Sequence, residues 1–207
     1  MTRVTAFLAC GVVLIGVALG FGWTIYARGA DEFAGCRRGS VAGGSGEIGG
    51  PFTLTDGSGA RVAAQDVITK PTLVYFGYTF CPDICPVDLA RNALAADELA
   101  EAGVEVGQVF ITVDPARDTP EVVAGFADFV HPDLVGLTGS EEDVAEAANA
   151  YRVYYSVPPG QDEFYLVDHS SFTYLVDPEA GFLEFYGSNV AAEEMAQSVS
   201  CFADAVG

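Results

Sequence analysis

An apolar, β-prone run that stops at two cysteines constrains the fold of this chain more than any other feature of its sequence. Leu73 to Phe76 are typical of a strand, and Val87 to Leu99 have the spacing of a helix. Cys81 and Cys85 therefore fall on the turn between them and on the first helical turn. Unsatisfied backbone N–H groups at a helix start favour thiolate over thiol, which lowers the pKa of a cysteine. The pattern indicates a reactive thiol pair; the alternative is two buried structural cysteines.

An uncharged apolar segment occupies the N-terminus. No charged residue occurs from Val4 to Ala27, and about 20 apolar residues are enough to span a bilayer. Aromatic residues and an arginine close the run, which is typical of an anchor whose N-terminus lies in the cytoplasm. We expect a transmembrane anchor over residues 1–28, a Gly-rich tether over residues 29–50 and a folded domain over residues 51–207. A cleaved signal peptide is the alternative, although its apolar region is normally shorter.

The part of the chain that follows this segment is strongly acidic. All 29 acidic residues but only seven of the nine basic residues follow Ala30, so this part carries a formal charge of −22. Such a charge opposes binding to phosphate backbones, and we expect no nucleic-acid partner. The charge is explained either by a solvated acidic surface or by steering toward a cation or a basic protein.

Strand and helix patterns alternate along the folded domain. Pro51 to Gly57 alternates polar and apolar residues and ends in Asp-Gly, which predicts an N-terminal hairpin, and a second hairpin is predicted around Asp177 to Gly181. A mixed sheet flanked by helices, with a thiol pair after a βαβ strand, predicts an α/β protein with a thioredoxin-like fold. The other predicted elements are strands 72–78, 106–113 and 134–137 and helices 87–102, 119–130, 140–151 and 191–205.

Two further cysteines lie near the two ends of the part of the chain that follows the apolar segment. Outside the cytoplasm a cysteine needs a partner, a metal or a reductant. We hypothesise that Cys36 and Cys201 form a structural disulfide that ties the membrane-proximal segment to the last helix of the domain. The alternative is two unpaired thiols.

The spacing of the first cysteine pair suits a metal as well as redox chemistry. Side chains four positions apart on a helical turn project from the same face, so the sulfurs of Cys81 and Cys85 can hold one soft ion or oxidise to a disulfide. Imidazole is the natural further ligand for copper or zinc, and the chain has two histidines. His169 lies in a polar loop that the fold could bring beside the cysteines. We interpret His131, which precedes a proline at a helix end, as structural.

Three segments together resemble the SCO/SenC proteins in order and spacing. They are Gly-Tyr-Thr-Phe-Cys-Pro-Asp-Ile-Cys-Pro at residues 77–86, Asp-Pro-Ala-Arg-Asp-Thr-Pro at residues 114–120 and Asp-His-Ser at residues 168–170. Members of this family are membrane-anchored, thioredoxin-like copper proteins that help to assemble the binuclear copper centre of cytochrome oxidase. The resemblance covers about Pro51 to Ala205.

The resemblance implies copper, as Cu(I) or Cu(II), as the cofactor. It implies that the copper ligands are Cys81, Cys85 and His169, of which the cysteines are also a redox pair. Four more residues match the family's motifs and are candidates to tune the ligands without binding the ion themselves: Asp83, Asp114, Arg117 and Asp118. We interpret Asp83 as the tuning residue and the loop of residues 114–120 as mainly structural.

These features lead to one function and two alternatives. The first is a copper chaperone in the bacterial inner membrane, with its domain in the periplasm, that delivers copper to the copper-A subunit of cytochrome c oxidase. Its further partners would be an upstream copper donor and a thiol reductant. The alternatives are a thiol:disulfide oxidoreductase acting on the cysteines of that subunit, which needs no histidine, and a copper or redox sensor. With only two methionines, the chain is not a methionine-rich copper relay.

Overall fold

The computed structural model describes residues 33, 35–37, 48–159 and 164–206. The anchor predicted over residues 1–28 lies outside these residues, as does most of the predicted tether. Within the described part of the chain, no helix is both long and apolar enough to cross a membrane. The fold belongs to the compact unit that begins at Cys36.

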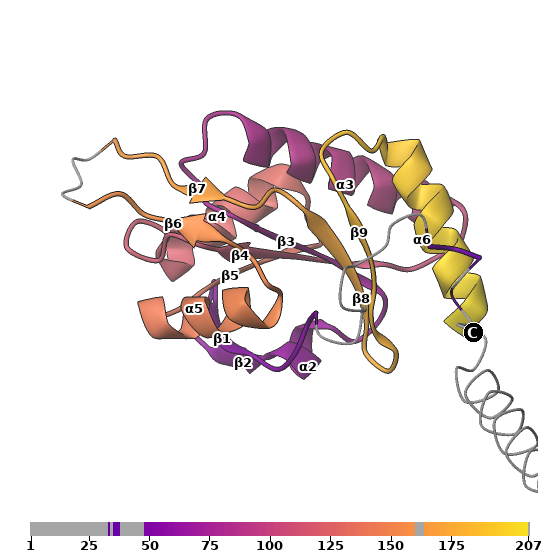
Figure 1. The fold of residues 1–207 in the computed structure, drawn as a ribbon, viewed down its shortest axis with the longest axis horizontal. Coiled ribbons are helices and arrows are strands. Elements are labelled where there is room, and N and C mark those ends of the chain that lie inside the picture. The colour runs from indigo at the N-terminus through magenta and orange to yellow at the C-terminus, as the bar shows by residue number, and fades with distance from the viewer. Residues whose placement is uncertain (1–32, 34, 38–47, 160–163, 207) are drawn as a thin grey trace, which may run out of the picture. The chain divides into compact units, whose positions relative to one another are not determined.

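A seven-stranded mixed sheet forms the centre of this unit, with the strand order β2-β1-β5-β4-β3-β8-β9 (Figure 1). Its three middle strands are parallel: β3 (Thr72–Gly77), β4 (Gly107–Thr112) and β5 (Leu134–Thr138). Tyr75 pairs with Phe110 in this register, and Val109 pairs with Val135. Parallel strands place their carboxyl ends at one edge, so the segment after β3 emerges beside the segments after β4 and β5.

Antiparallel hairpins flank the parallel centre on both sides, as the sequence predicts. One pairs with β5 and consists of β1 (Thr53–Asp56) and β2 (Arg61–Ala63). The other pairs with β3 and consists of β8 (Thr173–Asp177) and β9 (Gly181–Tyr186). Together with the helices that cover it, this mixed sheet agrees with the predicted thioredoxin-like α/β fold.

Helices cover both faces of the sheet (Figure 1). On one face α3 (Ile84–Glu101) packs beside α6 (Ala192–Val206), and α5 (Glu141–Ala150) lies on the other. The remaining helices are α4 (Pro120–Val130) and the short α2 (Ala64–Val67). α3 begins three residues before its predicted start at Val87. Pro86 does not delay it, because the first N–H groups of a helix have no intrahelical partner.

The strand β3 is anchored from both of its faces. All six of its residues are buried, and successive side chains point to opposite sides. The Tyr75 hydroxyl donates to Asp88 of α3 at 3.2 Å, whereas the Phe76 ring lies 5.3 Å from that of Tyr151, which follows α5. The end of β3, from which the cysteines follow, is therefore firmly fixed.

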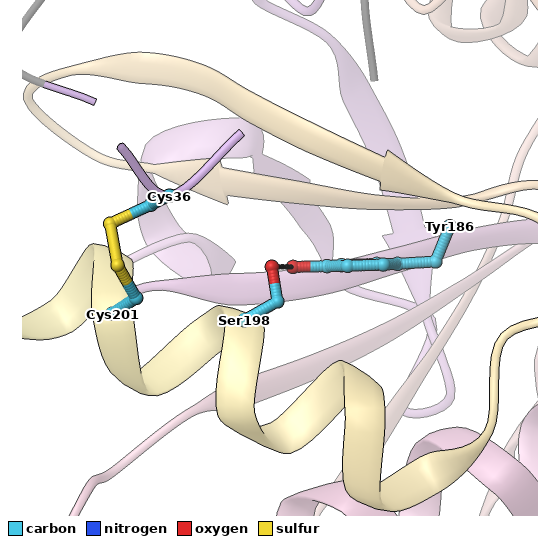
Figure 2. Close-up of a disulfide and its surroundings, with 4 residues drawn as sticks. All are labelled: Cys36, Tyr186, Ser198 and Cys201. Carbon is cyan, nitrogen blue, oxygen red and sulfur yellow. Dashed lines mark hydrogen bonds between the residues drawn. A yellow bond between two sulfur atoms is a disulfide. The ribbon is translucent and has the colours of Figure 1, made fainter. Parts of the chain in front are cut away.

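A disulfide joins Cys36 to Cys201 of α6, with 5.6 Å between the two Cα atoms (Figure 2). The same helix is tied to β9 by a hydrogen bond of 3.1 Å from the Tyr186 hydroxyl to Ser198 Oγ. The crosslink closes a loop of 165 positions. In the chain-entropy model such a loop stabilises the folded domain by about 5 kcal/mol, because it restricts the unfolded chain.

A separate two-stranded ribbon lies outside the main sheet. It consists of β6 (Tyr155–Ser156) and β7 (Asp168–His169), with Tyr155 opposite His169. The Ser170 N–H extends the pairing by donating to the carbonyl of Tyr154 at 2.8 Å. The sequence predicts a loop at His169, because strands of two residues are too short to show an alternating pattern.

Candidate metal centre

The fold brings Cys81, Cys85 and His169 together from distant parts of the chain. The two Sγ atoms and a ring nitrogen of His169 all lie within 4.8 Å of one another. The closest approach joins Cys85 Sγ and His169 Nε2 at 3.3 Å. Cys85 is buried, whereas Cys81 and His169 are half-buried, so solvent reaches the group at these two side chains. No other such group of potential ligands converges within the described residues.

The cysteines take their positions from the junction of β3 and α3. The Cys81 N–H donates to the carbonyl of Tyr78 at 3.2 Å, which closes the turn, and the Cys85 N–H points to Cys81 Sγ at 3.4 Å. Gly77 makes room for the second sulfur, since a Cβ atom there would lie 2.8 Å from Cys85 Sγ. The end of β3 therefore requires glycine for a steric reason.

The two thiols have opposite electrostatic environments. The pKa of Cys81 is lowered to about 3, chiefly by a hydrogen bond from the Cys85 thiol, with help from the backbone N–H groups of Asp83 and Cys85. Partial burial of Cys81 opposes this effect. The pKa of Cys85 is raised by the same pairing and by its burial. At neutral pH the pair therefore holds a Cys81 thiolate beside a Cys85 thiol.

The hydrogen bonds of His169 fix its tautomer. Its Nδ1 lies 3.0 Å from the carbonyl oxygen of Ser170, and a carbonyl only accepts, so Nδ1 carries the hydrogen. The lone pair of Nε2 then faces Cys85 Sγ. The rings of Tyr75 and Tyr78 meet the imidazole edge-on, with centroids at 6.4 and 5.8 Å. The imidazole is thus held in the orientation that a metal ligand needs.

The three donors fit a copper ion in size and chemistry. An ion about 2.2 Å from each of three coplanar donors separates them by about 3.8 Å, which is compatible with the spacing here. Two sulfurs with one imidazole favour copper or zinc over harder cations, and no carboxylate belongs to the group. The site can therefore hold copper and leave room for one further ligand.

The four other motif residues have different surroundings. Asp83 is the exposed N-cap of α3, and its carboxylate makes no capping hydrogen bond; the backbone N–H of this residue is the group that acts on Cys81. Asp118 is buried, which raises its pKa, and it accepts hydrogen bonds from the Thr79 N–H at 3.0 Å and the Thr79 hydroxyl at 2.5 Å. It therefore anchors the turn before Cys81.

Asp114 and Arg117 form an ion pair beside the segment that leads to the ribbon strand β7. Arg117 Nε lies 2.5 Å from Asp114 Oδ2, and the Tyr165 hydroxyl donates to Asp114 Oδ1 at 2.6 Å. Desolvation and this carboxylate raise the pKa of Tyr165 to about 12. The loop of residues 114–120, which we interpret from the sequence as mainly structural, thus joins the segment that leads to His169.

The sequence does not predict the role of several residues near the site. Tyr75 and Tyr78 read as strand residues, yet their rings hold the imidazole. Asp88 is fully buried and lies 3.3 Å from Arg91 Nη1, although an acid and a base three apart on a helix usually indicate an exposed pair. Only the alternation of side chains along β3 could have indicated that Tyr75 faces α3.

His131 lies apart from this group and agrees with its structural interpretation. Its Nε2 is 3.2 Å from Asp97 Oδ1 at the surface. Its Nδ1 accepts from the Asp133 N–H at 3.1 Å and lies 3.1 Å from the Gln108 side chain. These contacts join the end of α4 to α3 and β4.

Comparison with known proteins gives consistent matches. A family model described as SCO1/SenC matches residues 41–204. Protein SenC of Rhodobacter capsulatus is 48% identical over 205 residues, which cover 99% of this chain and 92% of that protein. A crystal structure of Arabidopsis thaliana ScoI with copper bound has 45% identity and a TM-score of 0.72, and the match covers 76% of this chain and 99% of that chain.

A more distant structure is similar as well. BsSco, described as a member of the Sco family of cytochrome c oxidase assembly proteins in which a disulfide switch was identified, is 26% identical with a TM-score of 0.60. The match covers 74% of this chain and 92% of that chain.

Proposed function

The chain belongs to the SCO1/SenC family, and we propose that it is a copper-binding protein that delivers copper to the copper-A centre of cytochrome c oxidase. The observation that carries this proposal is the convergence of Cys81, Cys85 and His169, whose donor atoms lie within 4.8 Å. Copper in the related Arabidopsis structure and the oxidase-assembly role of the BsSco family support it.

The environments of the ligands suggest an order of capture. The Cys81 thiolate is the more accessible sulfur and is already charged, so it meets the incoming ion first. Cys85 then loses its proton and His169 Nε2 completes the set. A three-coordinate ion leaves a position that a ligand of the acceptor protein can occupy, which permits transfer. In this proposal copper is the cargo of the protein.

The proposal extends to the position of the protein in the cell. We propose that residues 1–28 anchor it in the bacterial inner membrane and that residues 29–50 tether a periplasmic domain of residues 51–207. The uncharged run from Val4 to Ala27 supports the anchor, and the Cys36–Cys201 disulfide suits an oxidising compartment. Partners would be the copper-A subunit, an upstream copper donor and a thiol reductant.

Anaerobic copper titration of the reduced full-length chain in detergent tests the ligand set. We expect one equivalent to bind with thiolate-to-copper charge transfer, and Cys81→Ala, Cys85→Ala and His169→Ala each to lose it or change its spectrum. His131→Ala is the matched control, because that imidazole contacts Asp97 and Gln108 instead. Unchanged affinity and spectrum in His169→Ala would refute the assignment.

A second function, thiol:disulfide exchange, is favoured by the thiolate of Cys81 beside the thiol of Cys85. Cys81 would attack a disulfide of the copper subunit and form a mixed disulfide, releasing one partner thiolate. Cys85 would then attack Cys81, which leaves a Cys81–Cys85 disulfide and a reduced partner, and an external thiol would regenerate the pair.

The histidine separates the two functions. In copper-free conditions exchange should persist in His169→Ala, and Cys85→Ala should accumulate the mixed disulfide with a model disulfide peptide. Absence of exchange in the wild-type chain would remove this second function and leave copper delivery alone.

A further inference from the structure

Arg117 lies where the two segments that carry the site residues meet. Its guanidinium carbon lies 5.6 Å from the ring centroid of Tyr78 and 4.9 Å from that of Phe80, in the segment that leads to Cys81. It also lies 3.5 Å from the ring centroid of Tyr165, in the segment that leads to His169. A single guanidinium thus contacts both segments without being one of the three donors.

Polar contacts fix this guanidinium. Besides its pairing with Asp114, Arg117 donates from Nη1 to the backbone carbonyl of Tyr165 at 2.9 Å. The Tyr165 hydroxyl donates to the Asp114 carboxylate, so the three residues form a closed ring of hydrogen bonds. The side chains of Arg117 and Asp114 are only 14% and 2% exposed, which shields the pair from water and salt.

The loop that carries Arg117 is itself rigidly held. Beyond its bonds to Thr79, the Asp118 carboxylate accepts from the Thr112 hydroxyl of β4 at 2.5 Å. The backbone carbonyl of Asp118 accepts from the Thr138 hydroxyl of β5 at 2.7 Å. Arg117 therefore lies in a loop that is firmly bonded to the main sheet, and it is not part of the ribbon.

The ribbon needs a rigid attachment to the main sheet. Its strands β6 and β7 have two residues each, and a two-stranded ribbon alone is marginally stable in water. Arg117 holds it at Tyr165, three residues before β7, and contacts the ring of Tyr78, which in turn meets the His169 imidazole edge-on. Both contacts act on the placement of His169.

We propose that Arg117 is a positioning residue that holds His169 over the two cysteines. The inference rests on the proposed copper site and adds a residue that controls it without touching the ion. The planar guanidinium suits this role because it can stack on aromatic rings and donate in several directions at once. Lysine keeps the charge, but its compact ammonium has neither a plane that can stack on a ring nor a rigid fork of donors.

Variants of Arg117 test the proposal in the metal-free and the copper-loaded chain. Without metal, Arg117→Gln and Arg117→Lys should raise the hydrogen-exchange rate of the Ser170 amide at least about tenfold, because the ribbon opens more often. With copper, affinity should fall about 10- to 100-fold and the nitrogen coupling of Cu(II) should weaken. The alkylation rate of Cys81 at pH 8 should change by less than about twofold, because Asp118 still anchors the turn before it. Arg61→Gln, which breaks a two-bond Arg61–Asp143 pair elsewhere, is the control.

A double-mutant cycle decides whether Arg117 acts through His169. Arg117→Gln combined with His169→Ala should bind copper no more weakly than His169→Ala alone. Additive losses, or unchanged exchange at Ser170, would overturn the proposal. If Arg117→Gln does not fold, Tyr165→Leu removes the stacked ring, keeps the Arg117–Asp114 pair and should give the same pattern. A wild-type chain that binds no copper would refute the proposed function, whereas the metal-free exchange measurement would still judge the role of Arg117.

Discussion

The cysteines and the histidine of the site are held by two parts of the molecule with very different support. The cysteines follow β3, whose residues are all buried and which is paired with β4 on one side and β8 on the other. His169 lies in a strand of two residues that has a single partner. The thiol pair is therefore built into the sheet, whereas the imidazole is attached to it by a few side-chain contacts.

Under the proposed copper-delivery function, this difference would separate two tasks within one site. The sulfurs, supported by the buried strand β3, would retain the ion. An imidazole on a lightly held ribbon would leave the ion at lower cost when an acceptor binds. The following predictions test whether the two regions really differ in this way.

The largest difference should appear in global stability. Phe76 is fully buried on the face of β3 that lies away from the cysteines, so Phe76→Ala should cost about 3–5 kcal/mol in the free energy of unfolding. Tyr155→Ala in the ribbon, whose side chain is half-buried, should cost about 1 kcal/mol. Denaturant unfolding of both variants measures this, and equal losses would contradict the comparison.

The second-largest difference should appear in the rate at which each region opens locally and exchanges its amide hydrogens. The Ser170 amide, bonded only to the carbonyl of Tyr154, should exchange about 100-fold faster than the amides of β3 in the metal-free chain. This ratio corresponds to about 2.7 kcal/mol. Hydrogen exchange read by mass spectrometry or NMR gives the answer, and equal protection would mean that the ribbon is as firmly held as the sheet.

Steric demand at the end of β3 should have a smaller effect. In Gly77→Ala the new methyl group would lie 2.8 Å from Cys85 Sγ and 3.0 Å from the Tyr75 ring, which should cost about 1–3 kcal/mol and weaken copper binding. Gly125→Ala in α4 is the matched control, because a methyl group there meets nothing within 4 Å and alanine favours a helix. A Gly77→Ala chain as stable as wild type would contradict the tight fit.

The smallest effect concerns the pH dependence of Cys81. Because the pKa of Cys81 is lowered to about 3, the thiolate is already formed at pH 5, and alkylation at pH 5 and pH 8 should differ by less than about twofold. Cys85→Ala removes the main cause of the lowering, so the pKa rises and the rate at pH 5 should fall at least about tenfold below that at pH 8.

His169→Ala leaves the hydrogen bond from the Cys85 thiol in place and should change the profile less. Peptide mapping of the alkylated chain identifies Cys81 specifically. A larger effect of the histidine than of Cys85 would mean that the ribbon, not the thiol pair, sets the reactivity of Cys81.

Local patterns in the sequence were sufficient to predict the sheet with its two hairpins and the thiol pair at the junction of β3 and α3. Alternation along a strand and the 3.6-residue period of a helix report which side of each segment is buried. The two cysteines lie within one such junction, so their proximity follows from local geometry alone. The likeness of three short motifs to the SCO/SenC family pointed to His169 as their companion.

Only the tertiary structure placed that companion. Eighty-four positions separate Cys85 from His169, and the contact depends on a ribbon of two-residue strands that carries no periodic pattern. The contacts of Arg117 with Tyr78 and Tyr165 likewise join three loops at one edge of the sheet. A sequence encodes such meetings through the register and packing of whole elements, and no local pattern records them. The thiol pair was therefore determined by the sequence itself, and the complete three-donor site by the fold.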